Sequence, residues 1–155
     1  MRWDWLTYGV LAVAGLVTAS LAYRGVLSRR HAPELGLVQG RLRPCGAKPN
    51  AVCSQDSSPG HAIEPWVFQG SRSEDIARLK AILLSHPRTR IVAEGDNYIH
   101  AECRSALFGF VDDVEFLVDE NAHVIQVRSA SRQGYSDMGV NRTRVESFRA
   151  AFRGK

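Results

Sequence analysis

The residues of this chain best suited to binding or catalysis form a polar stretch at 128–144, RSASRQGYSDMGVNRTR. Its four arginines, three serines, one aspartate and one asparagine provide many hydrogen-bond donors and few acceptors. Guanidinium groups bind carboxylates and phosphates through paired, charge-assisted hydrogen bonds. The stretch therefore faces an anion, which is either a bound ligand or the protein's own carboxylates. With two polar neighbours from earlier strands, the candidate binding residues are His100, Asp113, Arg128, Ser129, Ser131, Arg132, Ser136, Asp137, Asn141, Arg142 and Arg144.

An anion site is one hypothesis for this stretch, because residues 136–139 immediately precede a predicted helix. Free N–H groups at a helix start attract a phosphate or carboxylate, and Arg132 and Arg142 are placed to add contacts. Asp137, however, stands where a helix cap is needed and fills the role of the anion itself. Segment 94–120 adds eight acidic residues against one arginine. The favoured interpretation is an internal clamp, and a small-anion (phosphate or carboxylate) site is the alternative.

Acid–base catalysis is a further hypothesis, carried by His100 and Glu102. Alternation along a strand places both side chains on one face, as a general acid–base pair requires. A histidine that is hydrogen-bonded among surface charges is the favoured interpretation, so no catalytic residue is assigned. Of the nearby carboxylates, Asp112 points to the face opposite Asp113 and Glu115, which leaves too few oxygen ligands and predicts no metal site. No cofactor is expected.

Three cysteines are present. Cys45 and Cys53 lie eight residues apart in a loop with turn-forming residues, and an oxidising compartment would allow a disulfide between them. Two cysteines without a Cys-x-x-Cys spacing or a nearby histidine pair are too few ligands for structural zinc. Cys103 alternates with apolar residues on a predicted strand and is expected to be a buried free thiol. The disulfide prediction is conditional on an extracytoplasmic domain.

The N-terminal segment indicates whether the protein is attached to a membrane. Residues 5–23 contain no charge, and as a helix they would span roughly 28 Å, close to the hydrocarbon thickness of a bilayer. Trp5 and Tyr23 stand at the two ends, as interfacial aromatic residues do. Residues 1–30 are therefore predicted to be an uncleaved transmembrane anchor with a basic flank. The alternative is a cleaved signal peptide, because residues 20–22 form a small-x-small site.

The charges around this segment bear on its orientation. Arg24, Arg29 and Arg30 follow the uncharged run, whereas Arg2 alone precedes it. Positively charged flanks remain preferentially on the cytoplasmic side. Considered alone, this rule predicts that the domain after the anchor faces the cytoplasm.

Two regions follow the anchor. Residues 31–70 are rich in proline and glycine, which predicts a loop-rich connector, and 71–155 are predicted to form the α+β domain. The first helix begins at Ser71, whose Ser-x-x-Glu spacing is a capping box, and ends before Pro87. The last helix covers about 141–152. The predicted strands are 89–94, 98–105, 110–118 and 123–130. Short connections require antiparallel pairing, so the expected fold is a four-stranded antiparallel sheet with two helices packed on one face.

The final hairpin gives Arg128 a predicted partner. With 119–122 as the loop, Phe116 opposes Ile125 on an apolar face. On the other face, Asp113 opposes Arg128. This register supports the clamp interpretation of the polar stretch.

The segments 109–116 (GFVDDVEF) and 128–144 together resemble the uncharacterised domain-of-unknown-function family 1499, over about residues 42–152. The resemblance implies a bacterial or plastid protein with a membrane or lipid anchor and an extracytoplasmic domain, and it brings no established activity. One departure concerns the cysteines. The family has a cysteine directly after Pro-Asn, whereas Ala51 follows Pro49-Asn50 here. A disulfide is therefore not carried over from the family.

The expected function combines these observations. The net charge is +4, but acidic and basic blocks alternate along the chain, so no nucleic-acid partner is expected. The prediction is a non-enzymatic accessory or binding module, anchored in the bilayer through residues 5–23, that docks on a membrane protein complex or an envelope component. With the resemblance included, the predicted location is the inner (plasma) membrane, with the domain in the periplasm. The alternatives are a cytoplasmic-facing domain, a small-anion-binding domain, and an enzyme using His100 and Glu102.

Overall fold

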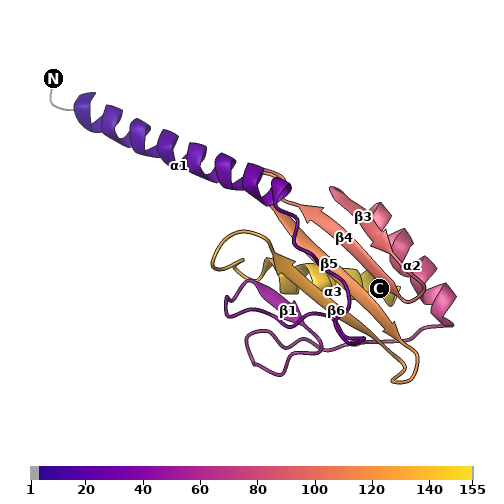
Figure 1. Cartoon of the computed structure of the whole chain (residues 1–155). Helices are drawn as coiled ribbons and strands as arrows, with labels where there is room; N and C mark the ends of the chain where they lie inside the picture. The colour runs from indigo at the N-terminus through magenta and orange to yellow at the C-terminus, as the bar shows by residue number, and fades with distance from the viewer. Residues whose placement is uncertain (1–3, 155) are drawn as a thin grey trace.

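The structure is a computed structural model that describes residues 4–154. Residues 1–3, which begin the predicted anchor, and residue 155 lie outside the described part. A long helix, α1 (Asp4–Arg30), projects from one side of an α+β domain (Figure 1). The class is the one predicted from the sequence.

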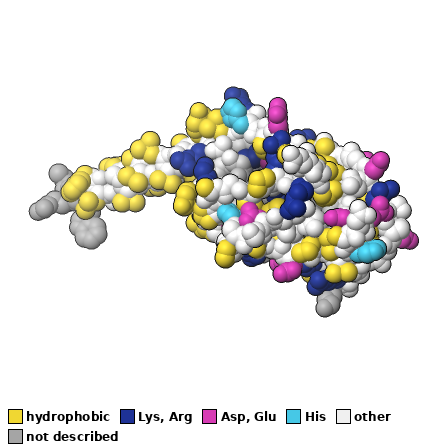
Figure 2. Space-filling model, turned by 60° about the horizontal axis from the view of Figure 1, so that its bottom comes forward, with side chains coloured by type: hydrophobic (Ala, Val, Ile, Leu, Met, Phe, Trp, Pro, Cys, Tyr) yellow, Lys and Arg dark blue, Asp and Glu magenta, His cyan; other side chains and the backbone are white. Residues whose placement is uncertain are grey.

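Helix α1 contains the uncharged run and is largely uncovered by the domain. It is the one helix among residues 4–154 that is long and apolar enough to cross a membrane, with a mean hydropathy of 1.7 and 6% of the segment buried. Large apolar side chains such as Trp5, Leu11 and Leu16 are exposed along it. Figure 2 shows this apolar surface as a projection away from the rest of the molecule. A soluble domain's core helix would instead be buried.

The domain contains one antiparallel sheet. Its strands are β1 (Ala51–Cys53), β2 (Trp66–Val67), β3 (Thr89–Glu94), β4 (Tyr98–Arg104), β5 (Val111–Asp119) and β6 (Val124–Ser131). Their order is β1-β6-β5-β4-β3, and β2 also pairs with β6. The predicted count of four strands is wrong because the connector supplies β1 and β2. At three and two residues, these segments are too short to show an alternating pattern, and their pairing with β6 defines them.

The predicted register of the β5–β6 hairpin is wrong by two residues. Glu115, not Asp113, lies opposite Arg128, and Phe116 lies opposite Val127. The turn begins one residue later than predicted, because Asp119 stays in the ladder and its carboxylate accepts a hydrogen bond from a turn amide. A shift of two residues keeps every side chain on its face, so the apolar matching was preserved while the ionic partners changed.

Helices α2 (Arg72–Ser85) and α3 (Val140–Phe152) pack on one face of the sheet, as predicted. The capping box at Ser71 is present, because its side chain and that of Glu74 each bond the other residue's backbone amide. Leu79 from α2 and Phe148 from α3 are buried against the strands. The core is completed by Trp66, which is 1% exposed.

The opposite face of the sheet is covered by the connector, which crosses it after leaving α1 (Figure 1). A small apolar cluster forms there from Leu42, Cys53 and Leu117, with Cys45 and Tyr98 packed beside it. The rest of this face is polar; its acidic side chains Glu102, Asp113 and Glu115 are buried, whereas Arg90 and Arg104 are exposed.

Candidate functional site

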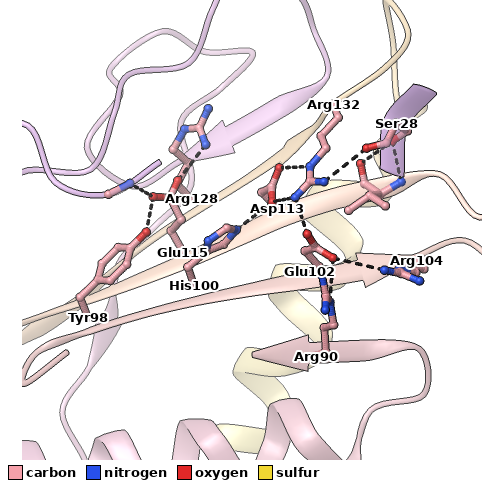
Figure 3. Close-up of polar contacts among 12 residues, drawn as sticks. Ser28, Arg90, Tyr98, His100, Glu102, Arg104, Asp113, Glu115, Arg128 and Arg132 are labelled. Carbon is pink, nitrogen blue, oxygen red and sulfur yellow. Dashed lines mark hydrogen bonds and ion pairs between the residues drawn. The ribbon is translucent and has the colours of Figure 1, made fainter. Parts of the chain in front are cut away.

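The polar face of the sheet holds two neighbouring groups of hydrogen-bonded polar and charged side chains, here together called the polar network (Figure 3). It consists of Arg90, Tyr98, His100, Glu102, Arg104, Asp113, Glu115, Arg128 and Arg132. Because alternate residues of a strand share a face, β4 contributes four members and β5 two, while Arg128 lies on β6 and Arg132 directly follows it. Sequence alternation predicted this grouping for all members except Arg90, Tyr98 and Arg132.

Arg132 occupies the centre of the polar network. Its Nε and Nη2 atoms donate to the two carboxylate oxygens of Asp113, each over 2.7 Å, and Nη2 also donates to Glu102 over 2.7 Å. The three side chains are 3%, 2% and 7% exposed. Two buried carboxylates therefore share one buried guanidinium, and their further compensation comes from His100 and Arg90.

These contacts hold both carboxylates in the charged form. Burial raises the pKa of Asp113, but hydrogen bonds from Arg132 and His100 outweigh it, so that pKa lies below its ordinary value. Burial likewise raises the pKa of Glu102, and Arg90 and Arg132 more than reverse the effect. The hydrogen bonds to Asp113 raise the pKa of Arg132. The centre is thus a stable set of opposite charges.

His100 and Glu102 lie on the same face, as predicted, but they are engaged with different partners. The Nε2 atom of His100 is 2.8 Å from Asp113, and Glu102 binds Arg90 and Arg132. The His100 side chain is 11% exposed. The two side chains are therefore not paired with each other in the way that the acid–base hypothesis required.

A second part of the polar network is centred on Glu115, which is fully buried. Its carboxylate accepts hydrogen bonds from Arg128 Nη1 at 2.9 Å, from the Tyr98 hydroxyl at 2.7 Å and from the Gly36 amide at 3.2 Å. Burial and then the hydrogen bond to Glu115 raise the pKa of Tyr98, which keeps its hydroxyl protonated. The Gly36 contact attaches the connector to the sheet.

The end of α1 is docked against the sheet beside Arg132. The Ser28 hydroxyl accepts from the Val111 amide at 2.8 Å and donates to its carbonyl at 3.3 Å, and Arg132 Nη1 donates to the Ser28 carbonyl at 3.3 Å. Arg29 donates to the carbonyls of residues 108 and 109. At Gly25, a Cβ atom would lie 2.1 Å from the Phe108 carbonyl oxygen, so only glycine permits this approach. The helix and the domain are therefore rigidly coupled.

The other half of the polar stretch lies on the helix-covered face. Arg144 Nη2 donates to Asp112 at 2.6 Å, which ties α3 to β5. Asn141 is fully buried; its side chain accepts from Ser129 and donates to Ser131 and to the Asn50 carbonyl. The predicted clamp between the final hairpin and the last helix is present here, with these partners.

Asp137 caps α3 from an unexpected position. The N-cap residue is Gly139, whereas the Asp137 carboxylate accepts from the amides of Gly139 at 3.1 Å and Asn141 at 2.8 Å. Burial raises the pKa of Asp137, but the Asn141 and Gly139 amides lower it by more, and the net direction is downward.

We expect Asp137→Ala to lower the free energy of unfolding by about 1 kcal/mol, because two amides at the helix start lose their acceptor. Urea denaturation of the full chain in mild detergent would measure this change. Ser136→Ala is the matched control, because the Ser136 hydroxyl accepts one hydrogen bond, from an exposed turn amide. An Asp137→Ala variant as stable as Ser136→Ala would contradict the capping role.

The candidate residues thus divide between the two faces of the sheet and the α3 turn. Arg128, Arg132, Asp113 and His100 belong to the polar network, whereas Ser129 and Ser131 of β6 contact Asn141 and Arg144 of α3. The remaining residue, Arg142, donates to the Gly60 carbonyl. Ser28 and Asn50 were missed because their partners are distant in sequence; Ser28 and Arg132 are separated by 104 positions. No spacing in the sequence signals such contacts.

Cys45 and Cys53 lie in hydrogen-bond contact beside Arg128, and all three cysteines are free thiols. The hydrogen bond from Cys45 lowers the pKa of Cys53 to about 7, against the effect of burial, and raises the pKa of Cys45. Cys103 is a buried free thiol, as predicted. Within residues 4–154, no group of three or more His, Cys, Asp or Glu side chains is arranged to hold a metal ion.

The disulfide between Cys45 and Cys53 stays a prediction that depends on the compartment. If the domain is extracytoplasmic, we expect the native protein to resist alkylation at both thiols, with only Cys103 labelled after unfolding. Closing this short loop would stabilise the fold by about 2–3 kcal/mol. Non-reducing mass spectrometry of protein purified from its own membrane checks this. Alkylation of both thiols would contradict the disulfide and, with it, this support for an oxidising compartment.

Comparison with known proteins gives one match. Residues 41–152 match the family model DUF1499, described as a protein of unknown function. This confirms the resemblance drawn from segments 109–116 and 128–144. No curated protein and no solved structure matches the chain.

Proposed function

Because this chain belongs to the DUF1499 family, which has no assigned activity, we propose a function from its architecture: it is a membrane-anchored, non-enzymatic module. The domain is held at the membrane surface and docks on a membrane protein complex or an envelope component. The membrane is the inner (plasma) membrane, crossed once, and the domain lies in the periplasm. A cytoplasmic-facing domain is the alternative that the basic flank of α1 favours.

The observation that carries this proposal is the contrast between the two ends of α1. Its first five turns expose apolar side chains to the surroundings, which only a bilayer or another apolar partner would cover. Its last turns, from Gly25 to Arg29, are docked on the sheet through backbone and side-chain contacts. A flexible linker would anchor a domain equally well, so the rigid coupling supports a role in which orientation relative to the membrane matters.

The polar network supports a non-enzymatic role. Its charged groups are engaged with one another, and their pKa shifts stabilise the ionised forms rather than placing a group near neutrality. Of the two arginines expected to contact an anion, Arg132 instead binds Asp113 and Glu102, and Arg142 donates to the Gly60 carbonyl.

Gly25→Leu separates anchoring from orientation, because the larger side chain cannot fit against the Phe108 carbonyl. We expect this variant to remain in carbonate-washed membranes while a stoichiometric partner, recovered with the native chain after crosslinking in mild detergent, is lost. Gly9→Leu is the matched control, because nothing lies within 4 Å of a Cβ atom at that position of the same helix. Near-UV circular dichroism would verify that the variant domains stay folded.

Two results would contradict the proposal. Release of the native chain by carbonate would show that α1 is not an anchor. Recovery of the partner with Gly25→Leu at the native level would show that the rigid coupling is not required for docking.

A further inference from the structure

A groove lies where α1 meets the domain, and the contacts described above do not use it. Its volume is about 620 Å³. One wall is the end of α1, including Tyr23 and Arg24, and the other is formed by Lys48 with the loop at Gly134 and Tyr135. The groove is therefore shared between the proposed membrane span and the domain.

The charge of the groove is positive and uncompensated. Among the residues that the structure describes, the Arg24 and Lys48 side chains have no hydrogen-bond or ion-pair partner, and no acidic residue lines the groove. Figure 2 shows basic side chains where the apolar helix enters the domain. Arg128, Arg132 and Arg144, in contrast, are each paired with a buried or nearly buried carboxylate. Arg24 and Lys48 therefore remain available to an external anion.

The position of the groove along α1 indicates which anion it would meet. Tyr23 is the last residue of the uncharged run, and Arg24 is the first charge after it. Tyrosine and arginine at the end of a membrane span lie at the level of the lipid headgroups. The mouth of the groove is consequently at the depth of the headgroup phosphates.

Both walls are fixed in place. On the helix side, Gly25 contacts the Phe108 carbonyl and Ser28 bonds Val111. On the loop side, the Asn50 side chain donates to the Gly134 carbonyl at 3.1 Å. Two cations from distant parts of the chain are thus held on one groove, whereas a flexible basic flank would place its charges diffusely.

We propose that this groove binds the phosphate of an anionic phospholipid headgroup, with Arg24 and Lys48 contacting the phosphate oxygens. Charge-assisted hydrogen bonds from both cations to one phosphate provide the specificity, and the exposed Tyr135 ring covers the glycerol region. This inference rests on the proposed membrane anchorage of α1. It adds a specific lipid contact that sets the depth and tilt of the domain.

Native mass spectrometry of the full chain in mild detergent tests the proposal, with phosphatidylglycerol titrated against phosphatidylcholine. We expect one phosphatidylglycerol to be retained and the paired substitution Arg24→Gln, Lys48→Gln to weaken it by at least about tenfold, since each basic residue near a membrane surface contributes to anionic-lipid binding. Arg30→Gln, which removes a charge from the same end of α1 outside the groove, should change the affinity by less than about twofold.

Three outcomes would overturn the proposal. The first is unchanged retention in the paired variant. The second is an equal loss with Arg30→Gln, which would indicate diffuse attraction. The third is displacement of the lipid by inorganic phosphate at the same concentration, which would assign the groove to a free anion. Carbonate extraction of native membranes distinguishes these results from failure of the anchor: a chain that stays integral but shows any of them refutes the lipid site alone.

Discussion

Replacing Arg132 by alanine is expected to lower the free energy of unfolding by about 3–5 kcal/mol, because it leaves two buried carboxylates without their shared cation. Asp113 and Glu102 are 2% and 7% exposed, and Arg132 is 3% exposed. The substitution also removes the hydrogen bond to the Ser28 carbonyl, so the end of α1 should loosen. Chemical denaturation of the full chain in mild detergent measures the first effect, and hydrogen exchange at residues 25–30 measures the second.

Arg90→Ala is the matched control for this prediction. Arg90 binds the same carboxylate, Glu102, at 3.0 Å, but its side chain is 62% exposed. Solvent replaces an exposed partner at little cost, so we expect a loss below about 1 kcal/mol. Arg132→Lys should fall between the two, because it keeps the charge but loses the paired hydrogen bonds to Asp113. Equal losses for Arg132→Ala and Arg90→Ala would contradict the central role of Arg132.

The difference in stability between the native chain and the Arg132→Ala variant is expected to depend on pH. The folded-state pKa values of Asp113 and Glu102 lie below their ordinary values of 3.8 and 4.5. Their contribution to stability is therefore complete above those values and is lost as the pH falls below them. In the Arg132→Ala variant, protonation relieves the uncompensated charge. Because burial is then less opposed, these carboxyls protonate at higher pH in the variant. The stability difference from the native chain should consequently shrink as the pH is lowered through the acidic range, and a constant difference would argue against this electrostatic cause.

Glu115→Ala and Arg128→Ala are each expected to cost about 3–5 kcal/mol, since either change leaves the other charge buried without its partner. Glu115 is fully buried and Arg128 is 11% exposed. The Nε atom of Arg128 already has no partner, so the bond from Nη1 to Glu115 is its main compensation. The free energy of unfolding lost in the double variant should be smaller than the sum of the two single losses, with a coupling energy of about 1–3 kcal/mol.

A double-mutant cycle between Arg128 and Asp113 is the matched control for the cycle between Arg128 and Glu115, because it tests the register directly. Asp113 lies opposite Ala130 and binds Arg132 and His100 instead. Its coupling to Arg128 should stay below about 0.5 kcal/mol. A larger coupling there than between Arg128 and Glu115 would restore the register expected from the sequence and contradict the observed one.

The pairing register of β5 and β6 could not be predicted from the local sequence pattern. The period-two pattern specified which face each residue of β5 and β6 occupies, and every face assignment was correct. A shift of two residues conserves that pattern, so alternation could not choose between Asp113 and Glu115 as the partner of Arg128. The choice was made by the turn, where Asp119 remains in the ladder and accepts a hydrogen bond from the Ala122 amide.

The sequence by itself determined the long apolar helix, the α+β class, the two helices on one face and the family. Each of these follows from periodicity, caps or a contiguous motif, which are local properties. Only the tertiary structure decided the strands of the connector, the separation of the polar stretch into two clusters, and the docking of α1 through Gly25 and Ser28. These features depend on contacts between segments far apart in the chain, such as the 104 positions between Ser28 and Arg132. Local propensity carries no information about such contacts, because their energy arises only when burial brings the partners together.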